Sequence, residues 1–175
     1  MNSDMKFSII DIETTGLDAQ KHEIIEIACL MVNSNLEIVD RYQSKVIPER
    51  PEDSDPTALL VNGYSEASWK RALPLKKVMA DIAEMTQGTY LLAYNVSFDY
   101  AFLKAAFSKT GVQDGMKYQR LDLMTLAFFK IHDITSWSLK SVSEYLGIKP
   151  EPSVHQAMNG ATCAYEVFKR LTKQP

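Results

Sequence analysis

The segment 7–17 constrains this chain most, because it begins as an apolar strand and ends in two acids. Side chains two positions apart on an extended strand point to the same face, so Asp11 and Glu13 are predicted to lie side by side. Two neighbouring carboxylates repel each other, and a hard divalent cation such as Mg²⁺, which prefers oxygen ligands, removes that cost. Gly16, in the turn that follows, can take a positive φ and allow close approach to the backbone. Ordinary surface acids at an exposed strand end are the alternative interpretation.

The length of 175 residues favours one domain, residues 1–175, with a core of its own. A net charge of −3 argues against a surface that coats DNA non-specifically, but it allows an enzyme that grips a nucleic-acid end through metal ions. No apolar run approaches the roughly 18–20 residues that cross a bilayer, and the first residues lack the features of a signal peptide. We therefore expect a cytoplasmic location and no membrane partner. Cys29 and Cys163 are expected to be reduced and packed.

Hydrophobic patterning predicts three strands first and then alternating helices and strands. Strands over 22–32 and 36–47 follow the first one, and short turns between them indicate an antiparallel meander. The later predicted elements are a helical turn over 56–61, helices over 75–86, 98–108, 122–131, 138–146 and 155–171, and strands over 90–94 and 118–121. Ser97 is the predicted N-cap of the helix over 98–108. This order predicts an α/β fold with a central mixed sheet of about five strands flanked by helices.

A second informative segment, 94–103, lies where a predicted strand ends and a helix begins, the place where α/β proteins expose ligand-binding groups. Asp99 falls in the first turn of that helix, where a capping acid that interacts with the helix dipole is the alternative. The third segment, 153–161, contains His155. If a helix begins there, its positive end keeps the imidazole neutral, as a general base requires.

Together these segments resemble the exonuclease family with four acids and a histidine, usually called DEDDh, to which the proofreading epsilon subunit of bacterial DNA polymerase III and ribonuclease T belong. Residues 11–17 match its first motif, Asp-x-Glu-Thr-Thr-Gly-Leu, in full. In the second, His-Asn-x-x-Phe-Asp, the matches are Asn95, Phe98 and Asp99, while Tyr94 replaces the histidine. In the third, His-x-Ala-x-x-Asp-Ala, the matches are His155, Ala157 and Ala161. The likeness continues through 121–127 and 138–148 and so covers nearly the whole chain.

This resemblance implies a ribonuclease H-like fold and hydrolysis of phosphodiester bonds at nucleic-acid 3′ ends, releasing nucleoside monophosphates with two Mg²⁺ or Mn²⁺ ions. The implied metal ligands are Asp11, Glu13 and Asp99, and His155 would take the proton from the attacking water. The implied substrate-binding residues are Thr14, Gly16, Leu17, Asn95 and Phe98. Base stacking on Phe98, and less so on Phe102, competes with the core role that a spacing of four on a helix favours.

Gly160 stands where the family has its fourth acid. Neighbouring Asn159 would point roughly 100° away around a helix, so we expect one weakened metal site and a large loss of turnover. Three explanations are open: a deliberate change that traps a complex, a natural relative of low or no activity, or a nearby acid that reaches in. The acids considered are Glu23 and Glu26, and this explanation ranks last because Glu26 suits an anchoring role in its strand.

Two functions from different classes follow. The first is a metal-dependent 3′–5′ exonuclease acting on DNA or RNA with a free 3′ end. The second is a nucleic-acid-binding or polymerase-associated module that keeps the fold without catalysis. Gly160 favours the second, and His155 favours the first, because an abandoned site need not keep its base. A DNA polymerase and a second copy of the chain are the further candidate partners.

Overall fold

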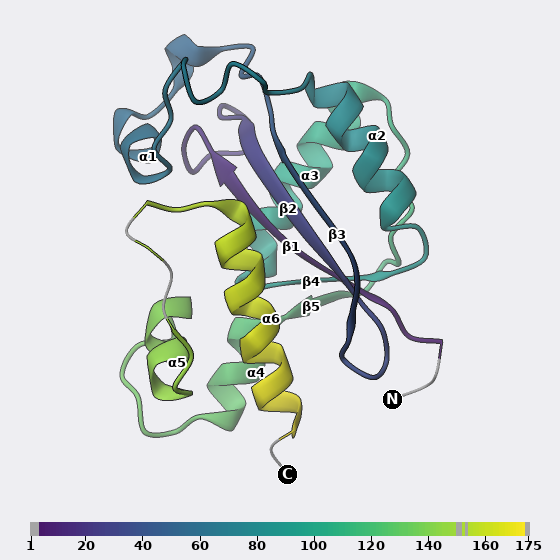
Figure 1. Ribbon diagram of the computed structural model, residues 1–175, viewed down its shortest axis with the longest axis vertical. Helices are drawn as coiled ribbons and strands as arrows, with labels where there is room; N and C mark the ends of the chain where they lie inside the picture. Colours follow the sequence, from purple (N-terminus) through teal and green to yellow (C-terminus); the bar gives the residue numbers. More distant parts are fainter. Residues whose placement is uncertain (1–3, 150–151, 153, 174–175) are drawn as a thin grey trace.

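The computed structural model describes residues 4–149, 152 and 154–173. A five-stranded mixed sheet with the strand order β3-β2-β1-β4-β5 forms its centre (Figure 1). The strands are β1 (Phe7–Thr14), β2 (Ile24–Val32), β3 (Ile38–Lys45), β4 (Tyr90–Ala93) and β5 (Arg120–Asp122). The first three are antiparallel neighbours, while β4 pairs in parallel with β1 and β5 with β4. The predicted α/β fold with an initial meander is confirmed.

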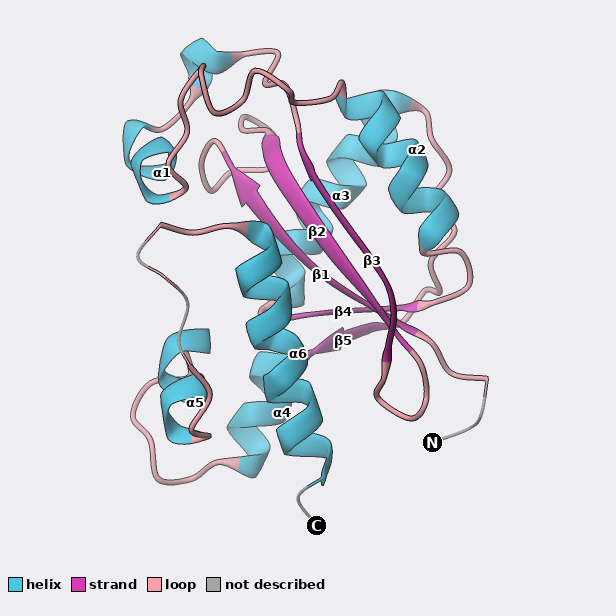
Figure 2. Cartoon of the chain, in the orientation of Figure 1, coloured by secondary structure: helices cyan, strands magenta, loops and turns pink. Residues whose placement is uncertain are grey.

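Helices lie on both faces of this sheet (Figure 2). They are α1 (Pro56–Val61), α2 (Leu75–Met85), α3 (Val96–Thr110), α4 (Leu123–Lys130), α5 (Leu139–Tyr145) and α6 (Ala157–Lys173), with a 3₁₀ turn, η1, at Pro51–Asp53. No helix of the described residues is long and apolar enough to span a membrane.

The side chains of β1 alternate between two hydrophobic clusters, as a pleated strand requires. Ile10 and Ile12 pack in the cluster that contains Phe102 of α3, whereas Phe7 and Ile9 pack in the cluster that contains Ala161 of α6. In Figure 1, α6 crosses in front of the strands while α3 lies behind them. The odd-numbered residues of β1, and with them both predicted acids, therefore belong to the α6 face.

The structure corrects several predicted boundaries. Ser97 is not the N-cap of α3: Asn95 is, in the left-handed region at φ 65°, and the Ser97 hydroxyl donates to the Asn95 side-chain oxygen at 2.9 Å. The strand predicted to begin at Tyr118 begins at Arg120, because pairing with β4 begins there, opposite Leu91, while Tyr118 is 92% exposed. The helix predicted from His155 begins at Ala157, because Gln156 supplies the first carbonyl that accepts helical hydrogen bonds, from Asn159 and Gly160.

Candidate active site

Asp11 and Glu13 lie near the carboxyl end of β1, and both are half-buried. Their strand pairs with β2 so that Asp11 is opposite Ala28 and Glu13 is opposite Glu26. A shift in register follows between Glu13 and Thr14, where the strand leaves the regular ladder. The two acids thus lie where the sheet ends and the following turn begins.

Gly160, on the first turn of α6, lies directly against the Asp11 carboxylate. A Cβ atom built on Gly160 would be 2.4 Å from Asp11 Oδ2 and 2.7 Å from Oδ1, both far inside van der Waals contact. The Asp11 side chain therefore occupies the space into which any larger residue at position 160 would project. The position where the resemblance expects the fourth acid thus faces the first acid, although the two are distant in sequence.

Asp99 lies in the first turn of α3, as predicted, and its side chain is buried. Burial raises the pKa of its carboxyl from the usual 3.8 to about 8. Hydrogen bonds from its own backbone and from that of Ile12 oppose this shift, and the negative charge of Asp122 adds to it. The bond to Ile12 places the Asp99 carboxyl beside β1, at the residue between Asp11 and Glu13.

The turn that carries Asn95 is held by Asp122, a residue to which the sequence assigned no site role. One oxygen of the Asp122 carboxylate accepts from the backbone N–H groups of Asn95 at 2.9 Å and Val96 at 3.1 Å. The other oxygen accepts from the backbone N–H and the hydroxyl of Thr125, so Asp122 is the N-cap of α4. Partial burial opposes the charge, but these hydrogen bonds prevail and lower the pKa of Asp122. The spacing of Asp122 and Thr125 could have indicated the cap of α4. No local pattern indicated that Asp122 also binds the backbone after β4.

The predicted substrate-binding turn after β1 is held mainly by its own backbone and by two nearby side chains. The Thr14 hydroxyl donates to the Gly16 carbonyl at 2.7 Å, and Asn62 Nδ2 donates to the Thr14 carbonyl at 3.0 Å. A Cβ on Gly16 would meet the ring of His22 at 2.5 Å, so only glycine fits beneath that imidazole. Leu17, by contrast, is 82% exposed. The turn therefore presents one apolar side chain to solvent from a fixed backbone.

His155 is exposed in the loop before α6, and its backbone N–H donates to the Val61 carbonyl at 3.0 Å. The same turn after α1 carries Asn62, which the sequence reasoning missed as a site residue. A Cβ on Gly63 would contact Val154 at 2.9 Å, so the turn lies close against the His155 loop. The turn at 61–63 consequently joins the loop of the predicted base to the turn after β1.

Phe98 is half-buried and Phe102 is buried in the core, with 5.0 Å between their ring centroids. Phe102 packs among the core residues of the α3 face, which supports its core role. Tyr94, which replaces the family's histidine, donates its hydroxyl to the Trp137 carbonyl. Of these aromatic residues, Phe98 is the one whose ring is both partly exposed and next to Asp99 in sequence.

The two acids that were considered as replacements for the missing one differ sharply in their surroundings. Glu23 accepts from Lys109 Nζ at 2.9 Å and from the backbone N–H groups of Glu49 and Arg50. Partial burial opposes its charge, but the Lys109 hydrogen bond and these N–H groups outweigh it and lower the pKa of Glu23. Glu26 is 2% exposed, and among the described residues Gln43 alone donates a side-chain hydrogen bond to it. Glu23 is thus committed to a structural network, whereas Glu26 is not.

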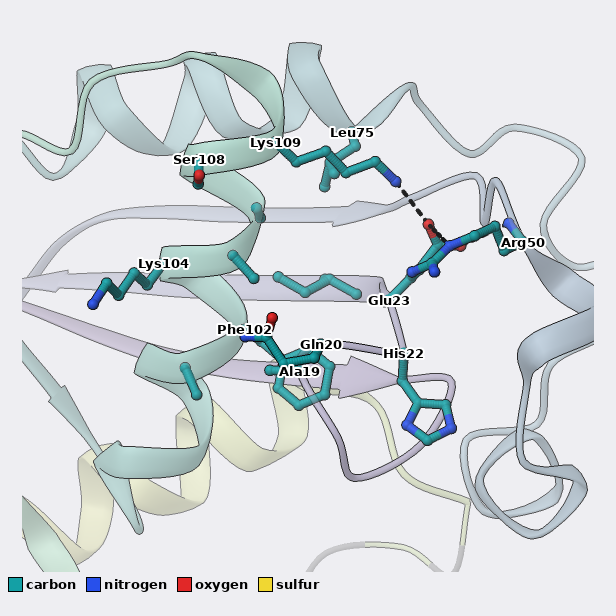
Figure 3. Close-up of a pocket in the computed structure, with 14 residues that line it drawn as sticks. Ala19, Gln20, His22, Glu23, Arg50, Leu75, Phe102, Lys104, Ser108 and Lys109 are labelled. Atoms are coloured by element: carbon teal, nitrogen blue, oxygen red, sulfur yellow. Dashed lines mark hydrogen bonds and ion pairs between the residues drawn. The ribbon is translucent and has the colours of Figure 1, made fainter.

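A cavity of about 520 Å³ lies between α3 and the β1–β2 connection (Figure 3). Figure 3 shows Lys109 and Arg50 converging on Glu23 at its rim, while Phe102 lines its wall. None of the predicted metal ligands lines this cavity. Phe102 belongs to the core on the α3 face of the sheet, so the cavity lies on the face opposite Asp11. It gives no support to the predicted catalytic site.

The structure brings position 160 to Asp11 and brings Asp99 to the backbone between the two β1 acids. It does not bring together a complete set of metal ligands. Across residues 4–149, 152 and 154–173, no group of three or more His, Cys, Asp or Glu side chains is arranged to hold a metal ion. The assignment of Asp11, Glu13 and Asp99 as ligands stays a prediction.

Comparisons with known proteins fit this geometry. Residues 8–168 match the model of the exonuclease family RNase_T. The chain is 30% identical over 171 residues to the PolC-type DNA polymerase III of Thermotoga maritima, covering 97% of this chain and 12% of that one. It is 30% identical over 174 residues to the 3′-5′ exonuclease DinG of Staphylococcus epidermidis, covering 94% of this chain and 18% of that one. The chain thus spans about an eighth of the length of the PolC-type relatives that it matches.

Solved structures show the same fold. E. coli exonuclease I in a zinc-bound complex with single-stranded DNA superposes with a TM-score of 0.81 at 20% identity, covering 98% of this chain and 41% of that one. A further exonuclease I structure superposes with a TM-score of 0.83 and the same identity. The predicted ribonuclease H-like fold and the resemblance to the DEDDh exonucleases are confirmed. With its family motifs meeting at the end of β1 and its family model matched almost from end to end, the chain belongs to the exonuclease family RNase_T.

Proposed function

We propose that this chain is a metal-dependent 3′–5′ exonuclease that hydrolyses phosphodiester bonds at the 3′ ends of nucleic acids and releases nucleoside monophosphates. We further propose that Gly160 lowers its activity relative to family members with an acid at that position. The proposal rests on family membership and on the local geometry of β1, α3 and α6.

The observation that carries the proposal is the contact between Gly160 and Asp11. A residue in the third motif touches the first acid of the first motif, so the segments that carry the family motifs meet at one place. The second motif reaches the same place through the hydrogen bond between Asp99 and the backbone of Ile12. Surface acids on an unrelated fold would have no reason to converge with these two segments.

The donor set suits Mg²⁺ or Mn²⁺, because Asp11, Glu13 and Asp99 offer only oxygen ligands. A buried carboxylate oxygen of Glu26, opposite Glu13, has no hydrogen-bond partner among the described residues, which also fits a nearby cation. When bound, two divalent ions would supply an activated water and neutralise the scissile phosphate. In this proposal His155 takes a proton from the water, and the turn at 14–17 together with Asn95 and Phe98 holds the terminal nucleotide.

Single-stranded DNA is the substrate that the comparisons favour first, since the exonuclease I structure holds it. The PolC-type relatives suggest a DNA polymerase as a partner, either on the same chain or on another. The second candidate function, a binding module without catalysis, is favoured by Gly160 alone. It predicts nucleic-acid binding with no release of mononucleotides.

The test compares the protein with a Gly160→Asp variant on 5′-labelled single-stranded DNA and RNA in Mn²⁺ and in Mg²⁺. An Asp11→Ala variant serves as the catalytic control. Slow stepwise shortening by the wild type, faster shortening by Gly160→Asp and none by Asp11→Ala are expected. Shortening by Gly160→Asp alone would identify the wild type as a disabled enzyme. No shortening by either protein would refute the exonuclease proposal.

A further inference from the structure

We propose that Glu26 supplies an acidic metal ligand that offsets the missing acid at position 160, binding the cation together with Glu13. This inference rests on the proposed metal-dependent function and extends it to a residue on a different strand. Four observations carry it: the strand register, the burial of Glu26, an oxygen of Glu26 without a hydrogen-bond partner, and the lack of an ion pair to Glu26 within the described part of the chain.

The register of β1 and β2 places Glu26 directly opposite Glu13. Directly opposed residues of an antiparallel pair point to the same face of the sheet, with Cβ atoms about 4.5–5.5 Å apart. Asp11 shares that face, because it is two residues from Glu13 on the same strand. The side chains of Asp11, Glu13 and Glu26 therefore leave the same face of the sheet, the face on which Gly160 contacts Asp11.

Burial makes the environment of Glu26 unusual for a glutamate. Its side chain is 2% exposed, and Oε1 accepts one hydrogen bond from Gln43 Nε2 at 2.7 Å. Oε2 is buried and has no hydrogen-bond partner among the residues that the structure describes. Native proteins leave few buried polar atoms unsatisfied, because an unpaired buried group loses its hydration without compensation, and a charged group loses most. A cation that binds Oε2 would satisfy it.

The basic residue best placed to neutralise Glu26 is engaged elsewhere. Lys45 is the residue opposite Glu26 on β3. Its ammonium group lies 3.7 Å from the centre of the Trp69 ring and donates to the Ser68 carbonyl at 3.1 Å. Among the ion pairs of the described residues, none involves Glu26. Like charges directly opposite across a strand pair destabilise it, and a cation bound by both Glu13 and Glu26 would remove that repulsion.

Glu26 matters for metal binding because position 160 carries no acid. Position 160 on α6 offers no carboxylate, and the Asp11 side chain lies where a side chain at that position would project. An acid on β2 can restore the number of anionic ligands from the sheet side, without any residue on α6. Glu23 cannot do so, because Lys109 and two backbone N–H groups already hold its carboxylate.

Mn²⁺ binding, measured by calorimetry without nucleic acid, tests the inference apart from activity. Glu26→Gln should weaken Mn²⁺ binding at least about 10-fold, since even groups that only support metal ligands commonly contribute 10–100-fold. Glu84→Gln, at an exposed position on α2, is the matched control and should bind Mn²⁺ like the wild type. Glu26→Asp, which keeps the charge but shortens the side chain, provides a second variant if the amide perturbs folding. It should also weaken binding, with an unchanged circular dichroism spectrum.

A double-mutant comparison tests the replacement itself. If Glu26 stands in for the lost acid, Glu26→Gln should cost clearly less Mn²⁺ affinity in the Gly160→Asp background than in the wild type, because coupled residues are non-additive. Equal losses in both backgrounds, or wild-type affinity in both Glu26 variants while Asp11→Ala loses binding, would overturn the inference and leave the proposed function standing. Failure of the wild type and of Gly160→Asp to bind Mn²⁺ would refute the metal-dependent function together with the inference.

Discussion

The contact between Gly160 and Asp11 predicts how a larger residue at position 160 changes the free energy of unfolding. Alanine in a helix interior is favoured over glycine by about 1 kcal/mol, yet a Cβ here meets the Asp11 carboxylate, and overpacking typically costs about 1–3 kcal/mol. Because the carboxylate is the far end of a half-buried side chain, a rotation of Asp11 would relieve much of that clash. Gly160→Ala is therefore expected to stay within about 2 kcal/mol of the wild type.

Gly160→Asp adds a second negative charge at the same place. Two unit charges about 4 Å apart repel by at most about 4 kcal/mol near a protein surface, and solvent exposure reduces this toward about 1 kcal/mol. A change of 1 kcal/mol shifts the melting temperature of a chain of 175 residues by about 2–4 °C. In EDTA, Gly160→Asp should therefore melt at least about 2 °C below Gly160→Ala.

Mn²⁺ should reverse that order. A ligand present at 100 times its dissociation constant stabilises the folded state by about 2.7 kcal/mol, and the added carboxylate strengthens binding only in the aspartate variant. Differential scanning fluorimetry of the two variants, in EDTA and across a Mn²⁺ titration, measures both effects. If the two variants instead melt at the same temperature in EDTA and respond alike to Mn²⁺, residue 160 does not face the predicted acids.

Three further predictions concern residues around the site. Because burial keeps Asp99 protonated in the folded chain while the unfolded chain releases its proton, the metal-free protein should lose stability as the pH rises from about 3.8 towards about 8. Asp99→Asn should flatten this slope in melting curves recorded in EDTA, and an unchanged slope would exclude Asp99 as its source. Asp122→Ala removes the acceptor for Asn95 and Val96 and the cap of α4, at about 1 kcal/mol for each helix terminus, so its melting temperature should fall by several degrees. A thermal melt of Asp122→Asn, which keeps one acceptor, should give an intermediate value rather than that of the alanine variant. Asn62→Ala removes a buried hydrogen bond to Thr14, so urea unfolding should show a loss of about 1–3 kcal/mol, and a loss near zero would show that this bond does not hold the turn.

The order of elements, the antiparallel start of the sheet and the segments that carry the family motifs can all be predicted from the sequence. These features follow from interactions between residues close in sequence, namely alternation on strands, spacing on helices and the chemistry of turns. Asp99 in the first turn of α3 is such a case. Helix starts were less certain, because Asn95 in a left-handed conformation replaced the expected cap at Ser97.

Which residues distant in sequence come into contact depends on how the elements pack. Strand register set Glu26 against Glu13, and the docking of α6 on the sheet set Gly160 against Asp11. The reach of Asp122 to the end of β4 likewise depends on the pairing of two parallel strands that are separated by a helix. Such contacts follow from packing across the whole core rather than from local preference. Sequence therefore identified the acids, while packing decided which of them share a site.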